Sequence, residues 1–241
     1  MNKVIFLAAF LFGYTVQAIT GFAGNIFCMP VGTHTLGLHE SVSVLNAMGF
    51  FACGLLGVMN IKHVNWRELG KIVGIMLPFV LLGIWLDTVL PLDALLIIYG
   101  VVIVAVGVKN LMQKQQRFLP EGALVAVVMG AGLIQGMFVS GGALLVIYAV
   151  QKIRDKQQFR ATLSMVWAIL NLIYAVIAFQ QGHFTSDVVQ VIACCVPLAI
   201  LATFLGNKLQ ARISQQRFLT LTYALLIAIG GVLLVTSLGS L

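Results

Sequence analysis

The sequence predicts an all-α integral membrane protein built as an inverted repeat, in which each half is a broken, re-entrant helical hairpin followed by three transmembrane helices. Two observations lead to this prediction. Of the 241 residues, 61% are hydrophobic and only 9% are charged, whereas about 25% of a soluble domain is charged. Thirteen of the fourteen lysine and arginine residues also fall into four short clusters between long apolar stretches. The clusters are Lys62/Arg67/Lys71, Lys109/Lys114/Arg117, Lys152/Arg154/Lys156/Arg160 and Lys208/Arg212/Arg217.

Apolar length predicts the individual elements, because a spanning helix needs about 20 mostly apolar residues. Six segments meet this requirement: 42–60, 68–87, 92–112, 160–180, 187–207 and 217–237. Two further apolar regions, 3–32 and 120–150, are each interrupted near the middle by glycine and polar residues. We expect these two regions to be broken hairpins, and the sequence does not reveal whether their arms cross the membrane fully.

The basic clusters predict the topology, because lysine and arginine stay on the cytoplasmic side of short membrane loops. If 3–32 and 120–150 each crossed once, two of the four clusters would lie outside. If each region returns to the side from which it entered, all four clusters become cytoplasmic. We therefore expect hairpins, with both termini outside and Lys3 as the single exception.

The two halves of the chain resemble each other at the interrupted regions. Gln17 precedes Gly24 by seven residues, and Gln135 precedes Gly142 by the same interval. We expect repeats over 1–118 and 119–241, forming one membrane domain. Three crossings after each hairpin would insert the second repeat upside down, which is the plan of many secondary transporters. The alternative is an accidental likeness between two glycine-rich apolar stretches.

The hairpin breaks carry the candidate site. A helix that begins after a break offers free N–H groups and a partial positive charge, which suit an anion. Glycine allows a ligand close to the backbone, and neutral polar side chains add donors. The alternative role of these glycines is close helix packing. The residues concerned are Gln17, Thr20, Gly21, Gly24 and Asn25 at the first break, and Gln135, Ser140, Gly141 and Gly142 at the second.

Three polar residues outside the breaks have two interpretations each. Asn46 and Asn171 lie inside predicted spans, where each could face the central site or hydrogen-bond between helices. Arg160 follows the second hairpin and could draw anions to the inner mouth, or it could be an ordinary interfacial arginine. The centres of the six spans lack ionised residues, so a neutral-donor anion site is favoured over a carboxylate-based cation site.

Several function classes are disfavoured. The charges separate apolar spans and form no basic face, which argues against nucleic-acid binding. Four cysteines, Cys28, Cys53, Cys194 and Cys195, lie in apolar segments without metal-ligand spacing, and we expect them to be small buried side chains. No catalytic set is apparent, so we expect neither an enzyme nor a metal or other cofactor.

The chain resembles the sulfite exporter TauE/SafE family of membrane permeases. The resemblance is carried by Gly21-Phe-Ala-Gly24 with Pro30, by Gly136-Met-Phe-Val-Ser-Gly-Gly142 with the apolar run to Tyr148, and by Phe159-Arg-Ala-Thr-Leu163. It implies transport of small sulfur-containing anions, such as sulfite, sulfoacetate or other sulfonates, across the bacterial inner membrane. At the first break the family often has more glycine than this chain, where Asn25 follows Gly24.

We therefore expect a multi-pass permease that exports or exchanges a small sulfur-containing anion by alternating access. The alternative is a transporter or channel for another small anion, either a carboxylate or an inorganic ion. The expected partners are that anion and the lipid bilayer, and homo-oligomerisation stays open.

Overall fold

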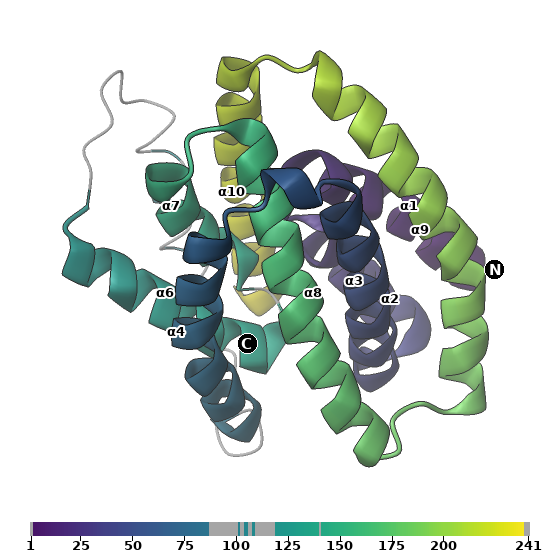
Figure 1. Cartoon of the computed structure of the whole chain (residues 1–241). Coiled ribbons are helices and arrows are strands. Elements are labelled where there is room, and N and C mark those ends of the chain that lie inside the picture. Colours follow the sequence, from purple (N-terminus) through teal and green to yellow (C-terminus); the bar gives the residue numbers. More distant parts are fainter. Residues whose placement is uncertain are drawn as a thin grey trace. The chain divides into compact units, whose positions relative to one another are not determined.

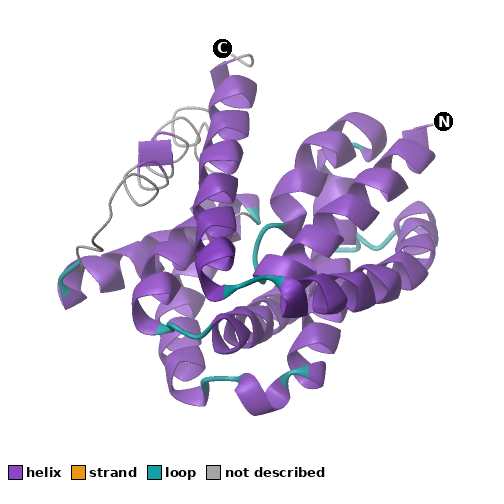
Figure 2. Cartoon of the chain, turned by 90° about the horizontal axis from the view of Figure 1, so that it is seen from above, coloured by secondary structure: helices purple, strands orange, loops and turns teal. Residues whose placement is uncertain are grey.

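The structure is a computed structural model that describes residues 2–86, 101, 104–105, 108, 119–139 and 141–238. The secondary structure of these residues is helical, with no strand among them (Figures 1 and 2). In chain order the helices are α1 (Asn2–Thr20), α2 (Gly24–Leu36), α3 (Leu38–Met59), the short 3₁₀ helix η1 (Ile61–His63), α4 (Trp66–Leu86), α6 (Glu121–Phe138), α7 (Gly142–Lys152), α8 (Lys156–Gln180), α9 (Ser186–Arg212) and α10 (Gln215–Leu238).

Within the described part of the chain, five helices are long and apolar enough to cross a membrane: residues 3–20, 40–59, 66–86, 156–180 and 186–212. The predicted spans 42–60, 68–87, 160–180 and 187–207 therefore coincide with α3, α4, α8 and α9. Helix α10 covers the predicted span 217–237, although its continuous apolar window is shorter. The predicted span 92–112 lies almost entirely outside the described residues.

Both interrupted regions contain a helix break where the sequence predicts one. The first break separates α1 from α2 at residues 21–23, and the second separates α6 from α7 after Phe138. The arms of each pair pack against each other. Their far ends also lie together, since Lys152 at the end of α7 forms an ion pair with Glu121 at the start of α6. In the first pair, Lys3 and Leu36 line one cavity.

The two arms of each pair differ in length. Helices α1 and α6 have 19 and 18 residues, while α2 and α7 have 13 and 11. At 1.5 Å per residue these lengths correspond to about 27–28 Å for the first arms and about 16–20 Å for the second arms. The first arm is therefore close to the thickness of a hydrocarbon core of about 30 Å, and the second arm falls short of it.

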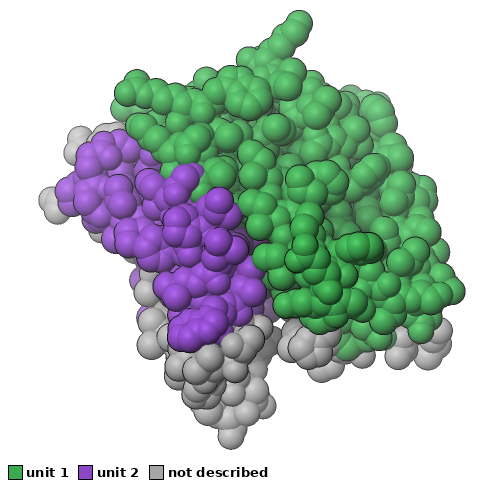
Figure 3. All heavy atoms as spheres, turned by 60° about the horizontal axis from the view of Figure 1, so that its bottom comes forward, with its two compact units in different colours: residues 1–73, 153–212 green, residues 74–152, 213–241 purple. Residues whose placement is uncertain are grey.

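The chain divides into two compact units, each assembled from both halves of the sequence (Figure 3). Unit 1 comprises residues 1–73 and 153–212, and unit 2 comprises residues 74–152 and 213–241. Helices α1, α2, α3, α8 and α9 belong to unit 1, and α6, α7 and α10 belong to unit 2.

Unit 1 is held together by close helix contacts. Helix α3 packs on α8, and α1 packs on α9 and α2. Glycines let α3 approach α8, because a Cβ at Gly57 would stand 2.8 Å from Cγ of Met165, too close for an unmoved neighbour. Phe10 and Tyr14 stack in the core with ring centroids 4.0 Å apart. This packing through small residues is typical of membrane helices, and it fixes α8 beside the first break.

Unit 2 uses the same device between α4 and α6. A Cβ at Gly132 would stand 2.6 Å from the carbonyl oxygen of Met76, and one at Gly136 would stand 3.0 Å from Cα of Gly83. Gly83, Gly132 and Gly136 thus bring the two backbones into direct contact.

Candidate functional site

The first break is a compact turn organised by Gln17 and two glycines. Gly21 has a φ of +89°, a left-handed conformation that glycine adopts easily. Its backbone N–H donates to the carbonyl oxygen of Gln17 at 2.6 Å. The Gln17 amide crosses to α3, where its Nε2 donates to Sγ of Cys53 at 2.6 Å. Gly24, the first residue of α2, leaves room for the Gln17 side chain, because a Cβ there would stand 2.8 Å from that of Gln17.

Two of the predicted residues near this break are tied into the surrounding helices. The hydroxyl of Thr20 donates to the carbonyl oxygen of Val16 at 2.9 Å, which is a bond within α1. Asn25 accepts a hydrogen bond from the Tyr14 hydroxyl at 2.9 Å. Asn46 is fully buried on α3, where its Nδ2 donates to the carbonyl oxygen of Val42 and its Oδ1 has no partner.

Arg160 is the only predicted site residue that brings a full charge to the break. Its side chain is 2% exposed. One Nη donates to the carbonyl oxygen of Ala18 at 2.9 Å, and the other donates to Oδ1 of Asn60 at 3.1 Å and of Asn207 at 2.5 Å. Its backbone lies directly against Gly21, since a Cβ on that glycine would stand 3.2 Å from Cα of Arg160. Arg160 is thus a buried residue and not an exposed interfacial arginine.

The charge on Arg160 has no protein counter-charge in the described part of the chain. The ion pairs there are Lys3–Asp187, Lys71–Glu68 and Lys152–Glu121, and none includes Arg160. All three acceptors around the guanidinium are neutral, and Nε has no partner. A buried charge without a counter-charge is costly, so this arrangement favours the entry of an anion.

The second break lies in unit 2 and is organised by Gln135 in a similar way. Oε1 of Gln135 accepts from the backbone N–H of Gly141 at 3.1 Å, and the residue is 5% exposed. A Cβ on Gly141 would stand 2.9 Å from that of Gln135. Val139 takes a left-handed conformation with φ of 54°. Gly142 is buried and begins α7, and Ser140 lies outside the described residues.

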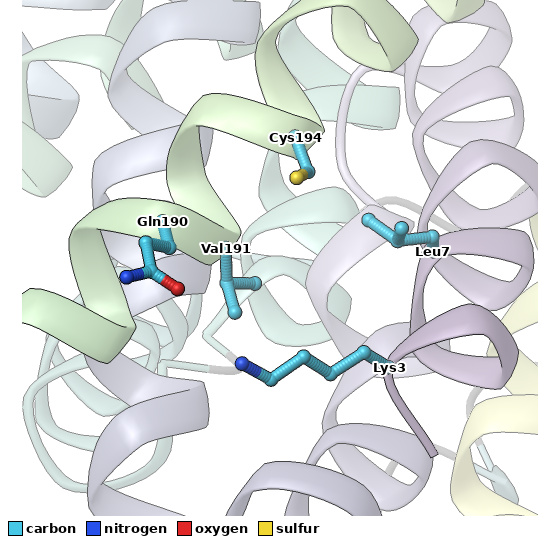
Figure 4. Close-up of a pocket in the computed structure, with 5 residues that line it drawn as sticks. All are labelled: Lys3, Leu7, Gln190, Val191 and Cys194. Atoms are coloured by element: carbon cyan, nitrogen blue, oxygen red, sulfur yellow. The ribbon is translucent and has the colours of Figure 1, made fainter. Parts of the chain in front are cut away.

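The opposite end of unit 1 carries two small cavities. One, of about 110 Å³, is lined by Lys3, Leu7, Gln190, Val191 and Cys194, and Figure 4 shows the Lys3 side chain of α1 extending toward α9. The other, of about 150 Å³, includes Lys3, Glu40 and Asp187. Lys3 and Ala18 lie on one helix, so these cavities are about 22 Å along α1 from the Arg160 contact.

Sequence reasoning missed Asn60 and Asn207, which hold the Arg160 guanidinium. Their position in the sequence could have identified them. Each asparagine lies at the end of an apolar stretch and beside a basic cluster, with Lys62 two residues after Asn60 and Lys208 directly after Asn207. The expectation that all four cysteines are buried is wrong for Cys194, which is exposed on α9. Among the described residues, no group of His, Cys, Asp and Glu could hold a metal ion.

Comparison with known proteins places the chain in a family. The family described as "Sulfite exporter TauE/SafE" matches residues 5–233, nearly the whole chain. The chain belongs to the TauE/SafE family. No solved structure matches it.

Two curated relatives of this TauE/SafE protein come from bacteria. A "Probable sulfite/organosulfonate exporter TauE" from Cupriavidus necator is 25% identical over 238 residues, covering 95% of this chain and 92% of the relative. A "Probable inner membrane transporter protein TsaS" from Comamonas testosteroni is 28% identical over 179 residues, covering 73% and 75%. The family is one of membrane exporters and not of enzymes, as the sequence predicted.

Proposed function

We propose that the protein exports or exchanges small sulfur-containing anions, such as sulfite, sulfoacetate or other sulfonates, across the bacterial inner membrane by alternating access. The observation that carries the proposal is Arg160, a buried guanidinium with neutral partners and an unpaired Nε. The names of the two relatives, one a sulfite/organosulfonate exporter and one an inner membrane transporter, support the substrate class and the membrane.

The chemistry of Arg160 suits an oxyanion. A guanidinium presents several N–H donors in one plane and matches the paired oxygen atoms of carboxylate- and phosphate-like groups. A sulfite or sulfonate group offers the same pairing of oxygens and a negative charge. In the absence of substrate, Ala18, Asn60 and Asn207 supply neutral acceptors. An arriving anion exchanges one or more of these for a charged partner without breaking an internal salt bridge.

The first break adds backbone donors to this site. Helix α2 begins at Gly24, and its N-cap residue Ala23 provides no side-chain hydrogen bond to the first turn. The initial N–H groups of a helix lack partners within the helix and attract anions. The Arg160 backbone lies against Gly21, three residues before α2 begins, and we propose that the α2 N-terminus and the guanidinium act on the same anion.

The second break, in unit 2, resembles the first break in its local pattern. Both breaks have a glutamine seven residues before the glycine that begins the next helix, and both have a long first arm and a short second arm. Short helices that start near the midplane are a common feature of substrate sites in inverted-repeat transporters. We therefore propose Gln135, Ser140, Gly141 and Gly142 as the candidate binding residues of the second repeat.

The orientation follows from the two ends of unit 1. Lys3, Glu40 and Asp187 share a cavity at one end, while Asn60, Asn207 and Arg160 meet at the other. At the second end, Lys62 lies two residues after Asn60 and Lys208 directly after Asn207, so we infer that this end is the cytoplasmic side by the positive-inside rule. Arg160 therefore takes up anions from the cytoplasm.

The test is flux of labelled sulfite and sulfoacetate through proteoliposomes. We expect saturable flux that falls at least about tenfold in Arg160→Gln, because a hydrogen bond to a charged group contributes about 1.5–3 kcal/mol and 1.4 kcal/mol is a factor of ten. Arg154→Gln is the matched control, since Arg154 is an exposed arginine of the same cluster. Gln17→Ala and Gln135→Ala test the two breaks. Absence of saturable flux for every small anion would refute the proposal.

The second candidate is a carrier for another small anion, either a carboxylate or an inorganic ion, because Arg160 and helix N-termini also bind such anions. Competition on the same liposomes separates the two. We expect sulfite and short sulfonates to inhibit labelled sulfoacetate flux at lower concentration than acetate, malonate, phosphate or chloride. The opposite ranking would favour the second candidate.

A further inference from the structure

Helix α8 carries a stripe of buried polar side chains that starts at Arg160 and continues into the helix. The stripe comprises Arg160, Ser164, Trp167 and Asn171, spaced by four, three and four residues, so all four lie on one helix face. Each is at least nine-tenths buried. Each also has a polar atom without a hydrogen-bond partner: Nε of Arg160, Oγ of Ser164, Nε1 of Trp167 and Oδ1 of Asn171.

This concentration of unpaired atoms needs an explanation. In the part of the chain that the structure describes, six buried side-chain polar atoms lack partners, and four of them lie on this stripe. Most buried polar side-chain atoms in proteins are hydrogen-bonded, and exceptions often have a functional reason. Within membrane helices, polar side chains turned inward typically mark a substrate path. A helix that served only for packing would carry apolar residues here.

The far end of the stripe meets amides from two other helices. Nδ2 of Asn171 and Nδ2 of Asn25 lie 2.5 Å and 3.6 Å from the point where a Cβ would stand on Gly49. Asn46 lies on α3 three residues before Gly49, on the same face, and its Oδ1 is buried and unpaired. Asparagines from α2, α3 and α8 therefore gather at one depth, and Gly49 leaves the space for them.

We propose a second, charge-free binding position for the transported oxyanion that is centred on the indole N–H of Trp167, with Ser164 on one side of it along α8 and Asn171 on the other. The inference rests on the proposed function. The hydroxyl of Ser164, the indole N–H of Trp167 and Nδ2 of Asn171 are neutral donors to anionic oxygens, whereas the unpaired Oδ1 of Asn171 is an acceptor. Seven residues of α8 separate Arg160 from Trp167, about 10 Å along the helix. A sulfite or sulfonate group is too small to span that distance, so it occupies the two positions in succession.

A neutral second position has a mechanistic consequence. An anion bound only by Arg160 would leave slowly, because charge-assisted hydrogen bonds are strong. Conduction through a pore requires sites that bind well enough to admit the ion and weakly enough to release it, and the same requirement applies to a carrier. Donors without charge, one to three turns farther along α8, let the anion leave the guanidinium while its oxygens stay hydrogen-bonded.

Trp167 provides a direct probe of this position. The chain has three tryptophans; Trp66 and Trp85 are 55% and 60% exposed, and Trp167 is 5% exposed. In the full-length Trp66→Phe/Trp85→Phe variant, Trp167 is the only tryptophan emitter. We expect its emission to change saturably on titration with sulfoacetate, but not with chloride at equal ionic strength. Free N-acetyltryptophanamide controls for collisional quenching.

The same titration in an added Arg160→Gln background distinguishes the two positions. We expect the saturable change to persist with a similar apparent affinity, because binding at Trp167 does not require the guanidinium. If the emission does not respond although wild-type flux is saturable and sensitive to Arg160→Gln, the second position is refuted and the proposed function stands. If no small anion is transported at all, the proposed function fails and this inference fails with it.

Transport by Trp167→Phe and Ser164→Ala gives an independent readout. Each variant removes one unpaired buried donor while keeping most of the side-chain volume, so thermal stability should stay equal or rise. Sulfoacetate flux should nevertheless fall about tenfold, because the anion loses a hydrogen bond at the second position. Trp66→Phe is the control and should transport normally. Normal flux in both Trp167→Phe and Ser164→Ala would overturn the proposal.

Discussion

The charge of Arg160 is solvated by three oxygens that are all neutral: one backbone carbonyl and two asparagine side chains. A carboxylate at either asparagine position would have balanced the charge and stabilised the closed site. Asparagine instead provides the same geometry without the counter-charge. The distinction suits a site that must bind an anion and then release it, because an internal salt bridge would compete with the substrate.

Asn207→Asp tests this idea directly. The substitution places a carboxylate where Oδ1 now accepts from Arg160 at 2.5 Å, and an internal ion pair then neutralises the guanidinium. We expect apparent affinity for sulfite to fall about tenfold or more, since the substrate must displace a charged hydrogen bond of about 1.5–3 kcal/mol. Thermal stability should hold or rise. Flux assays and thermal unfolding in detergent measure the two effects.

Asn65→Asp is the matched control for that experiment. Asn65 lies before α4, and its Oδ1 accepts from the backbone N–H of Glu68, a helix-capping role that aspartate also fills. Its transport should stay within about twofold of wild type, because the substitution keeps the cap and changes only the long hydrogen bond of 3.4 Å from Nδ2 to Oε1 of Gln158. If Asn207→Asp transports as well as Asn65→Asp, Arg160 is a structural arginine that stabilises the C-terminal end of α1.

Single residues were only partly predictable. The sequence singled out Arg160, Gln17 and Asn25 because polar residues in apolar segments are few. It could not identify Asn60 and Asn207 as partners of Arg160, because they lie 100 and 47 residues away from it in the chain. Such contacts depend on how α3, α8 and α9 pack, and helical periodicity contains no information about that packing.

At the scale of elements, the first break depends on Gly21 for two separate reasons. Its φ of +89° is strained for any residue with a side chain. A Cβ would in addition meet the backbone of Arg160 at 3.2 Å, so α8 would have to move away from the turn between α1 and α2. The break and the position of the guanidinium are thereby linked through one glycine.

Gly21→Ala and Gly182→Ala separate those two reasons. Gly182 also has a left-handed φ, of +75°, but a Cβ there would meet nothing within 4 Å. Both substitutions should cost about 1–2 kcal/mol of stability from backbone strain. Only Gly21→Ala should also lose most of its sulfite flux, because it displaces Arg160. Equal flux in the two variants, normalised to folded protein, would contradict a site at the first break.

The elements themselves were largely predictable, because apolar length and helix are closely coupled in membrane proteins. Helix ends were predicted less well. Helix α9 continues to Arg212, five residues beyond the predicted span 187–207, since polar residues such as Asn207 and Gln210 extend a helix as readily as apolar ones outside the hydrocarbon. The length of each hairpin arm depends on the residue at which the helix breaks. Local backbone φ angles determine that residue, and amino-acid composition does not.

At the scale of the whole molecule, the topology is set by charge. The predicted cytoplasmic side holds Asp155 beside its basic neighbours, and the predicted outer side holds His183 between α8 and α9. In a variant with all four native cysteines replaced, Asp155→Cys should be protected from a membrane-impermeant thiol reagent in intact spheroplasts. His183→Cys should be labelled, because 25 residues of α8 separate the two positions. Labelling of both or the reverse pattern would contradict the hairpin topology.

The predicted inverted repeat has two components: a broken hairpin in each half of the chain, and one site shared by the two halves. Charge and glutamine spacing predicted two hairpins, and the structure contains a helix break in each of the two regions. Whether Gln17 and Gln135 serve one central site stays a prediction, because they belong to different compact units. Sequence patterns predict each helix break from nearby residues. Whether the two breaks share one site depends on long-range packing, which such patterns do not contain.

The distribution of acidic residues leads to a prediction about the driving force. Every described acidic residue sits at the beginning of a helix: Glu40, Glu68, Glu121 and Asp187 lie in first turns, and Asp155 is the N-cap of α8. There they offset the positive end of the helix dipole. Proton-coupled carriers typically use carboxylates inside the membrane. The described helices offer no such group beside Arg160.

We therefore expect the membrane potential to drive export without a proton gradient. Moving one charge through 100 mV corresponds to about 2.3 kcal/mol, and 1.4 kcal/mol is a factor of ten, so a monoanion should distribute about tenfold per 60 mV. Potassium diffusion potentials set with valinomycin, at equal pH on both sides, measure this distribution for a monoanionic sulfonate and for sulfoacetate, whose sulfonate and carboxylate are both ionised near neutral pH. A dianionic substrate should show twice the slope. If flux instead requires a pH gradient and ignores the imposed potential, a proton-carrying group takes part in transport, and the carboxylate-free site proposed around Arg160 is incomplete.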